Sequence, residues 1–473
     1  MKPLTFILSA AILGLVSVLT LSSFYKKDNH QFSENFNDDN QTYNSNSRTT
    51  RQKENLTLST SFENDYYTRN HRQGHFYAEV VSGRYTSNSE KHIPLNLSVV
   101  IDRSGSMAGD KINSAKKAAK YIVDQLSSDD YLSIVIYDGS VDVLQYATRV
   151  SNKSLIKNKI DGITDRGGTN LMGGALEGYT QVKKYFNSNY INRVLLLSDG
   201  LANQGITDPG EIERIVRKKN MQDGISISTF GLGRDYNEDL MTSMAESGTG
   251  NYYFIDRGDQ IAGIFQKELN GLNEVVAQNA ELKITIPEFV NVDRVYGYKF
   301  EQVGRTLTIK FHDIFSEETK GVLIKYTVQS GMNTPVNFNT TLSYYDPSSE
   351  RKGTIALANI SEYTSDENQY RNSYSEWVGT QVAIYESNEQ LEMAMKEVDK
   401  GNYEEAKKIV RKNDEYIKSK PASIQQAPAM QGAVNVNADY ETKISNVESM
   451  RSEDVKFLQK DSKSSNYKVR NKK

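Results

Sequence analysis

Three short polar segments of this sequence carry side chains whose oxygen atoms suit a metal ion. The segment VVIDRSGSMAGD contains Asp102, Ser104 and Ser106 directly after an apolar run. Thr169 follows two glycines in DRGGTNLMGG, and Asp199 follows the apolar run in LLLSDG. Carboxylate and hydroxyl oxygens are hard ligands, which Mg²⁺ prefers in proteins. Beside three neutral hydroxyls, the two aspartates would balance the charge of one divalent cation.

These five residues can meet only if the fold brings the three segments together. Between residues 95 and 272, apolar runs alternate with amphipathic helical patterns. The expected strands are LNLSVVID (95–102), YLSIVIY (131–137), the shorter VDVLQY (141–146), NRVLLLS (192–198), ISISTFGLG (225–233) and NYYFID (251–256). The expected helices are KINSAKKAAKYIVDQL (111–126), TNLMGGALEGYTQVKKYF (169–186), EIERIVRKKNM (211–221), EDLMTSMAES (238–247) and DQIAGIFQKELNGL (259–272).

Most of these strands lack polar alternation, which is typical of a parallel sheet covered by helices on both faces. We therefore predict an α/β domain at residues 95–272 with a doubly wound, mainly parallel sheet. Such sheets bind ligands at the carboxyl ends of their strands. Asp102 and Asp199 stand at two such ends, so we expect the aspartates and the nearby hydroxyls at one edge of the sheet.

The order D-x-S-x-S, then Gly-Gly-Thr-Asn, then a strand ending in Ser-Asp-Gly resembles the metal-ion-dependent adhesion site of von Willebrand factor type A (VWA) domains. The resemblance covers roughly residues 95–272, and all five motif positions are present. It implies a magnesium site, with Mn²⁺ or Ca²⁺ as alternatives, whose ligands are Asp102, Ser104, Ser106, Thr169 and Asp199. It also implies an open coordination position that a partner protein fills with an Asp or Glu carboxylate.

Each of these residues also has an ordinary structural interpretation. Asp102 could cap the following helix, and Ser104 and Ser106 could be turn residues. Thr169 is a good helix N-cap. Asp199 followed by glycine is a common turn pair. These alternatives explain the residues one by one but not their common arrangement.

The sequence favours a binding protein over an enzyme. All five histidines lie outside the strand-end motifs, so Ser106 has no evident general base. No phosphate-binding loop with the GxxxxGK spacing occurs, and GSMAGDK is the nearest string. We therefore expect no catalytic residues and no organic cofactor. Asp235 also follows an expected strand, but a role as a turn or helix-cap residue explains it better.

The composition limits the class of protein. The chain has 473 residues, is 37% hydrophobic and carries a formal net charge of −3. That length allows roughly two to four domains with substantial cores. The near-neutral charge gives no basis for nucleic-acid binding, which usually needs a basic face. The sequence has no cysteine, which excludes disulfides and thiolate metal sites.

The N-terminal segment predicts export. Residues 4–21 form an uncharged, mostly apolar run that precedes Lys26 and Lys27. We expect residues 1–25 to be a signal peptide or a membrane anchor. The protein would then be periplasmic, membrane-anchored or on the cell surface. Residues 26–74 are rich in Asn, Ser and Asp, and we expect a disordered linker there.

Strand patterns also flank the α/β domain. HFYAEVVSGRY predicts a strand in the leading segment 75–94, and residues 276–366 contain alternating strands typical of a β-sandwich. Because the leading strand has no partner in a parallel sheet, we expect it to join the sandwich, with the α/β domain inserted. A similar order occurs in bacterial VWA proteins and resembles inter-alpha-trypsin inhibitor heavy chains. The alternative is an edge strand of the α/β sheet.

The C-terminal sequence is helical in character. Residues 370–420 predict a helical hairpin that turns at Gly401 and Asn402. GNYEEAKKIV resembles the turn of a tetratricopeptide repeat, but one hairpin does not make a solenoid. Residues 421–473 are expected to be a linker, a short helix and a basic, disordered tail.

These features lead to one functional prediction with two alternatives. We expect an exported, bacterial, non-enzymatic protein for cell adhesion that binds a protein or surface partner through a Mg²⁺ site. The first alternative is a structural or envelope-assembly subunit in which the metal only stabilises the VWA loops. The second is a hydrolase with an unrecognised site.

Overall fold

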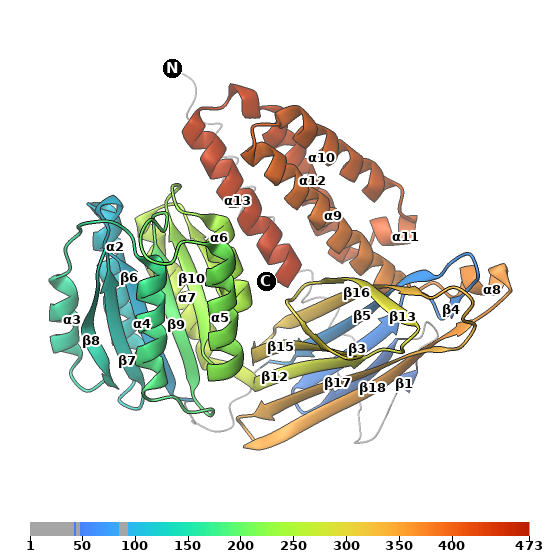
Figure 1. The fold of residues 1–473 in the computed structure, drawn as a ribbon, viewed down its shortest axis with the longest axis horizontal. Coiled ribbons are helices and arrows are strands. Elements are labelled where there is room, and N and C mark those ends of the chain that lie inside the picture. The colour runs from blue at the N-terminus through green and yellow to red at the C-terminus, as the bar shows by residue number, and fades with distance from the viewer. Residues whose placement is uncertain (1–41, 44–47, 85–92, 473) are drawn as a thin grey trace.

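The structure is a computed structural model that describes residues 42–43, 48–84 and 93–472. It has three parts, an α/β domain, a β-sandwich and a bundle of helices (Figure 1). The expected signal peptide or anchor at residues 1–25 lies outside the described residues, as does the expected linker up to residue 41. Among the helices that the structure describes, none is long and apolar enough to cross a membrane.

The α/β domain is built on a six-stranded sheet with the strand order β11-β10-β9-β6-β7-β8. β8 is antiparallel to β7, and the other neighbouring strands are parallel. The strands are β6 (Leu95–Asp102), β7 (Tyr131–Tyr137), β8 (Val141–Arg149), β9 (Ile191–Ser198), β10 (Ser226–Leu232) and β11 (Thr249–Ile255). This confirms the predicted doubly wound, mainly parallel α/β fold.

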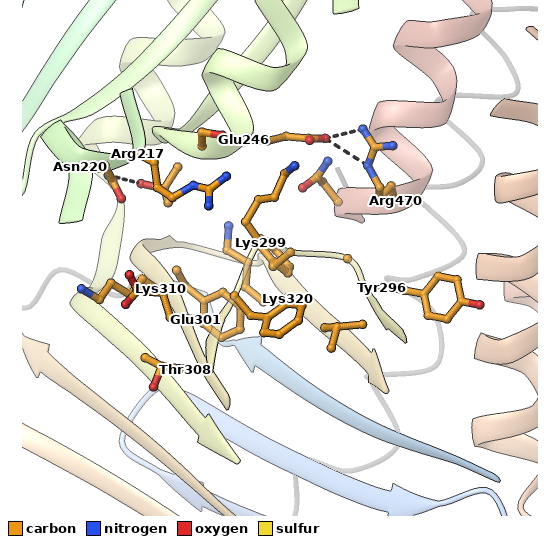
Figure 2. Close-up of a pocket in the computed structure, with 18 of the residues that line it drawn as sticks. Arg217, Asn220, Glu246, Tyr296, Lys299, Glu301, Thr308, Lys310, Lys320 and Arg470 are labelled. Atoms are coloured by element: carbon orange, nitrogen blue, oxygen red, sulfur yellow. Dashed lines mark hydrogen bonds and ion pairs between the residues drawn. The ribbon is translucent and has the colours of Figure 1, made fainter. Parts of the chain in front are cut away.

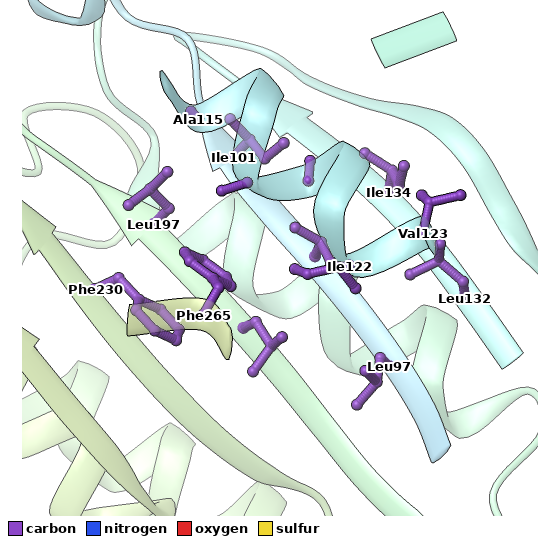
Figure 3. Close-up of a cluster of buried hydrophobic side chains, with 14 of the residues drawn as sticks. Leu97, Ile101, Ala115, Ile122, Val123, Leu132, Ile134, Leu197, Phe230 and Phe265 are labelled. Carbon is purple, nitrogen blue, oxygen red and sulfur yellow. The ribbon is translucent and has the colours of Figure 1, made fainter. Parts of the chain in front are cut away.

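Helices cover both faces of this sheet. They are α2 (Asp110–Gln125), α3 (Lys153–Asp161), α4 (Leu171–Lys183), α5 (Pro209–Asp223), α6 (Glu238–Ser247) and α7 (Ile261–Asn273), with the 3₁₀ turns η2 (Gly105–Met107) and η3 (Gly258–Gln260). All residues of β6 and β9 are buried, so these strands supply side chains to both faces. Figure 3 shows one face, where Ile101 and Leu197 share a core with Ile122 of α2 and Phe265 of α7. On the other face, Val100 shares a core with residues of α4, α5 and α6.

The β-sandwich consists of two six-stranded sheets, with the orders β1-β2-β3-β5-β16-β13 and β14-β15-β12-β17-β18-β4. The strands of the first sheet are β1 (Thr42–Tyr43), β2 (Thr49–Lys53), β3 (Leu56–Phe62), β5 (Gln73–Ser82), β13 (Val290–Tyr296) and β16 (Thr319–Val328). Those of the second sheet are β4 (Tyr66–Tyr67), β12 (Val275–Thr285), β14 (Glu301–Val303), β15 (Thr306–Phe315), β17 (Val336–Asp346) and β18 (Arg351–Tyr363). Phe62, Phe76, Tyr326 and Phe338 form a cluster of aromatic rings in the core of the sandwich.

The α/β domain stands between two strands of the sandwich. β5, which precedes the domain, pairs with β3 and β16 in the first sheet. β12, which follows α7, pairs with β15 and β17 in the second sheet. The alternative interpretation of the leading strand as an edge of the α/β sheet is therefore wrong.

The expected disordered linker at residues 26–74 is wrong in its second half. Residues 49–62 form β2 and β3, which pair with each other and extend the first sheet from β5. Leu56, Leu58 and Phe62 are buried in the sandwich core. Their spacing is that of a strand with one buried face. The polar residues around them lower the local hydrophobicity and conceal this short pattern.

The C-terminal part is a bundle of helices. They are α8 (Glu367–Asn372), α9 (Glu376–Asp399), α10 (Tyr403–Lys418), α11 (Ala422–Gln425), α12 (Pro428–Ser445) and α13 (Ser452–Asn471), with the 3₁₀ turn η4 (Val447–Ser449). The linker and disordered tail expected at residues 421–473 are wrong, since α12 and α13 occupy most of this segment. Tyr440 of α12 and Leu458 of α13 are buried in one core with Leu391 of α9 and Val410 of α10.

The last helix, α13, joins the bundle to the α/β domain, beside which it lies in Figure 1. The backbone amide of Tyr252 in β11 donates to the hydroxyl of Tyr467 at 3.1 Å. Arg470 forms ion pairs with Glu246 of α6 and Glu392 of α9. The residues expected to form a free tail therefore form a contact between two parts of the protein.

Candidate metal centre

Asp102 is the last residue of β6 and is fully buried at the carboxyl end of the α/β sheet. Its Oδ1 accepts a hydrogen bond from the backbone amide of Ser104 at 2.8 Å, and its Oδ2 accepts one from the Ser198 hydroxyl at 2.6 Å. The hydroxyls of Ser104 and Ser106 lie 3.1 Å apart in the turn that follows. The N-cap of α2 is Gly109, so Asp102 does not cap that helix.

Asp199 follows β9, which is the neighbour of β6 in the sheet. The Ser106 hydroxyl donates to Asp199 Oδ1 at 2.8 Å. A Cβ atom added to Gly200 would lie 3.3 Å from Thr169 Oγ1 and 3.4 Å from Ser106 Oγ, which places both hydroxyls beside this glycine. The structure therefore brings the five residues singled out in the sequence to one edge of the sheet.

The neighbouring loop holds Thr169 through its backbone. Its amide donates to Asn203 Oδ1 at 2.9 Å, and its carbonyl oxygen accepts a hydrogen bond from the Asn203 amide at 3.1 Å. The N-cap of α4 is Asn170, whose side chain accepts a hydrogen bond from the Gly173 amide at 3.0 Å. The interpretation of Thr169 as the helix N-cap is therefore wrong.

Two carboxylates, Asp102 and Asp199, are fully buried in this cluster. Burial raises the pKa of Asp102; hydrogen bonds from Ser104 and Ser198 oppose that rise, and the charge of Asp199 adds to it. Lys111 of α2 places its ammonium 2.5 Å from Asp199 Oδ2. Buried carboxylates require compensation by positive charge. Lys111 supplies one positive charge, and a divalent cation would supply two.

The donor set fits a hard divalent cation. The residues that would hold it are Asp102, Ser104, Ser106, Thr169 and Asp199. All five side chains offer oxygen, the ligand atom that Mg²⁺, Mn²⁺ and Ca²⁺ prefer. The segment 95–272 contains neither histidine nor cysteine, the usual ligands of zinc. When bound, the cation would act as a Lewis acid that accepts a further oxygen ligand.

The sequence analysis missed a group that joins two of these loops. Arg103 Nε and Arg166 Nε lie 2.9 and 2.8 Å from Asp138 Oδ2. Burial alone would raise the pKa of Asp138, but hydrogen bonds from Arg166 and Ser140 and the charge of Arg103 lower it to about 2. The Arg166 amide also donates to the Arg103 carbonyl oxygen at 2.7 Å. The available signal was an Asp-Gly pair directly after the strand 131–137.

Asp235, the other candidate after a strand, belongs to the contact with α13. Its carboxylate lies 2.8 Å from Lys456 Nζ, and this hydrogen bond lowers the pKa of Asp235. The N-cap of α6 is Asn237. Asp235 is therefore an ion-pair residue rather than the helix cap that the sequence suggested.

Residues 96–267 match the model of the von Willebrand factor type A domain. This match covers most of the α/β domain and includes all five candidate metal ligands. The chain contains a von Willebrand factor type A domain. The VWA domain thus runs from β6 into α7 and carries the candidate metal centre at the carboxyl ends of its strands.

The curated relatives share this domain. The uncharacterized protein YfbK of Escherichia coli strain K12 is 35% identical over 218 residues, which cover 46% of this chain and 38% of that protein. Human inter-alpha-trypsin inhibitor heavy chain H3 is 27% identical over 209 residues, which cover 41% of this chain and 23% of that protein. The matched region therefore spans less than half the length of either relative.

Two solved structures resemble this chain well beyond its VWA domain. The von Willebrand factor type A protein from Catenulispora acidiphila has a TM-score of 0.63 at 14% identity, over 84% of this chain and 98% of that chain. The ArnB paralog VWA2 from Sulfolobus acidocaldarius has a TM-score of 0.58 at 19% identity, over 83% of this chain and 98% of that chain. The likeness concerns the fold, and it extends to the parts around the VWA domain.

Proposed function

We propose that this chain is an exported, non-enzymatic protein that binds a partner protein through a divalent cation held by its VWA domain. VWA domains generally mediate protein–protein interactions and commonly bind a divalent metal. The observation that supports the proposal most is the meeting of five oxygen-bearing side chains around two fully buried aspartates. We take the ion to be Mg²⁺, with Mn²⁺ or Ca²⁺ as substitutes.

The exposure of the cluster suggests how a partner would reach the ion. Asp102, Ser104 and Thr169 are buried, whereas Ser106 is exposed. A partner would therefore approach from the Ser106 side and add an Asp or Glu carboxylate to the ion. Such a contact in a partly desolvated site would be stronger than a surface ion pair, which contributes about 0–1 kcal/mol.

The other parts of the proposal rest on the sequence. The segment 95–272 contains no histidine, so a hydrolase that used Ser106 would lack its usual general base. The apolar run at residues 4–21 supports export to the periplasm, the membrane surface or the cell surface. Both features are compatible with a binding protein outside the cytoplasm.

Titration of the metal-free protein with Mg²⁺ and Mn²⁺ in a calorimeter tests the metal centre. The unaltered protein should bind one ion per chain, and Asp199→Asn should lose this binding because a buried charged ligand is gone. Asp165→Asn is the matched control, since Asp165 is an exposed carboxylate just before the Thr169 loop. Equal binding by the unaltered protein and Asp199→Asn would refute the assignment.

Capture of partners from the envelope fraction of the source cells tests the adhesion step. Binding should require Mg²⁺, should be lost in EDTA, and should be weaker for Thr169→Ala although that variant keeps its thermal stability. Capture that is equally strong in EDTA would instead favour the structural or envelope-assembly subunit.

A further inference from the structure

A second candidate site lies where the three parts of the protein meet. A cavity of about 360 Å³ is lined by residues of α5 and α6 in the VWA domain, of the sandwich segment 294–301 with β15 and β16, and of α9 and α13 in the bundle. Figure 2 shows Arg217, Glu246 and Arg470 on one side of this space and Lys310 and Lys320 on the other. Its volume is within the range of small-molecule sites, roughly 300–1,000 Å³.

The cavity wall has more cationic than acidic side chains. The six cationic side chains are Arg217, Arg294, Lys299, Lys310, Lys320 and Arg470. The four carboxylates are Glu246, Glu301, Glu389 and Glu392. Arginines neutralise three of these carboxylates, since Arg470 pairs with Glu246 and Glu392 and Arg294 pairs with Glu389.

The lysines of the wall are not paired with these carboxylates. Lys299 Nζ lies 3.3 Å from Glu213 and Lys320 Nζ lies 2.5 Å from Glu318, and neither glutamate lines the cavity. Lys310, on β15, makes no hydrogen bond or ion pair with any residue that the structure describes. Positive charge on the sandwich side of the cavity is therefore available to an anion.

Three buried polar atoms on wall residues have no hydrogen-bond partner in the described part of the chain. They are Ser247 Oγ, the Tyr298 hydroxyl and Asn388 Oδ1. Ser247 is 4% exposed and Asn388 is 5% exposed, so these two side chains lie deep in the wall. Buried polar atoms nearly always have a partner in native proteins. Three such atoms around one cavity therefore indicate groups that a bound molecule would satisfy.

Aromatic rings provide an apolar side to the same cavity. Tyr298 and Phe311 pack edge to face with their ring centroids 5.0 Å apart. Tyr296, Phe300 and Tyr385 also line the space. Ligand sites typically combine such an apolar wall with a few polar groups that fix the orientation of the ligand.

We propose that this cavity binds a small organic anion with a ring-sized apolar body. Its carboxylate or phosphate group would lie beside Lys310 and Lys320, where charge-assisted hydrogen bonds are about twice as strong as neutral ones. Its body would lie against Tyr298 and Phe311. The unpaired hydroxyl and amide oxygen atoms of the wall would bind its remaining polar groups, so that the ligand contacts all three parts of the protein.

Calorimetric titration of the full described chain in low-salt buffer with EDTA tests this site. The probes are benzoate, phenyl phosphate, inorganic phosphate and the neutral benzyl alcohol. The variants are Lys310→Gln, which removes the unpaired cation, and Tyr298→Phe, which removes only the unpaired hydroxyl. Lys352→Gln is the matched control, because Lys352 is an exposed lysine on β18 of the same sheet and lies outside the cavity.

Benzoate or phenyl phosphate should bind more tightly than inorganic phosphate and benzyl alcohol, and the better of the two identifies the anionic group. Lys310→Gln should weaken this binding about fivefold and Tyr298→Phe about twofold, as expected for one ion pair and one hydrogen bond. Lys352→Gln should bind as the unaltered protein does. Equal binding by Lys310→Gln and Lys352→Gln would overturn the proposal, as would no binding of either ring-bearing anion at about 10 mM. Because EDTA is present throughout, this result is independent of the metal centre.

Discussion

Replacement of Lys111 by methionine should tighten Mg²⁺ binding and destabilise the metal-free protein. Lys111 Nζ lies 2.5 Å from Asp199 Oδ2, and both Asp199 and Asp102 are fully buried. In the metal-free protein, this ammonium neutralises one carboxylate of the pair. A divalent cation that takes Asp199 as a ligand must therefore displace Lys111, and the lost ion pair subtracts from the free energy of metal binding.

The two effects should be similar in size. Loss of one partner of a buried ion pair costs about 3–5 kcal/mol. The Lys111 side chain is 31% exposed, so solvent screens its charge and we expect a loss of about 1–2 kcal/mol. If the metal-bound forms of the two proteins are equally stable, the same 1–2 kcal/mol appears as roughly 5- to 30-fold tighter Mg²⁺ binding.

Calorimetry and urea unfolding together measure both sides of this comparison. The proteins are the unaltered chain, Lys111→Met and the control Lys117→Met, which changes an exposed lysine of the same helix. In EDTA, only Lys111→Met should unfold at a lower urea concentration, and in saturating Mg²⁺ all three curves should coincide. Lower stability in EDTA with unchanged Mg²⁺ affinity would refute the reasoning, because Lys111 would then stabilise the site without competing for it.

Three further predictions concern the rest of the chain. Arg470→Met leaves two glutamates unpaired and should lower the free energy of unfolding by about 2–3 kcal/mol in urea, whereas Arg451→Met, at an exposed ion pair, should not change it. Phe338→Ala removes a ring packed against three others and should cost about 3–5 kcal/mol in the same assay, so a loss below about 1 kcal/mol would contradict the assigned core. Burial, with the nearby positive charges of Lys310 and Arg193, lowers the pKa of His312 from 6.5 to about 4. The unfolded chain therefore binds the proton more readily, and stability should fall by about 1 kcal/mol between pH 7.5 and 5.5, a loss absent from His312→Gln.

The VWA domain could be predicted from the sequence because the relevant patterns are local. β6 and β9 are buried along their whole length and end at Asp102 and Asp199. The order of strands and helices then determines which strand ends meet, since ligand sites of such sheets form at the carboxyl ends. Lys111 and Asp138 were missed because their importance depends on charges that arrive from other loops.

The strands β2 and β3 and the helices α12 and α13 were missed because their partners are distant in the sequence. Thr60 of β3 donates to Asn359 of β18 at 2.6 Å, across 299 positions. Lys463 of α13 lies 2.7 Å from Glu238 of α6, across 225 positions. Local composition therefore suggested disorder for polar and basic segments whose charges and hydroxyls are satisfied elsewhere in the fold.

The metal centre and the cavity occupy opposite edges of the α/β sheet. Asp102 and Asp199 stand at the carboxyl ends of the parallel strands β6 and β9. The cavity is lined by Thr249, the first residue of β11, and by Asn220 and Ser247, which lie in the last turns of α5 and α6. Because β11 runs parallel to its neighbour β10, its first residue lies at the amino edge of the sheet. A ligand in the cavity would therefore act on the junction of the three parts, whereas an ion would act on the loops at the other edge, and each proposal can fail without the other.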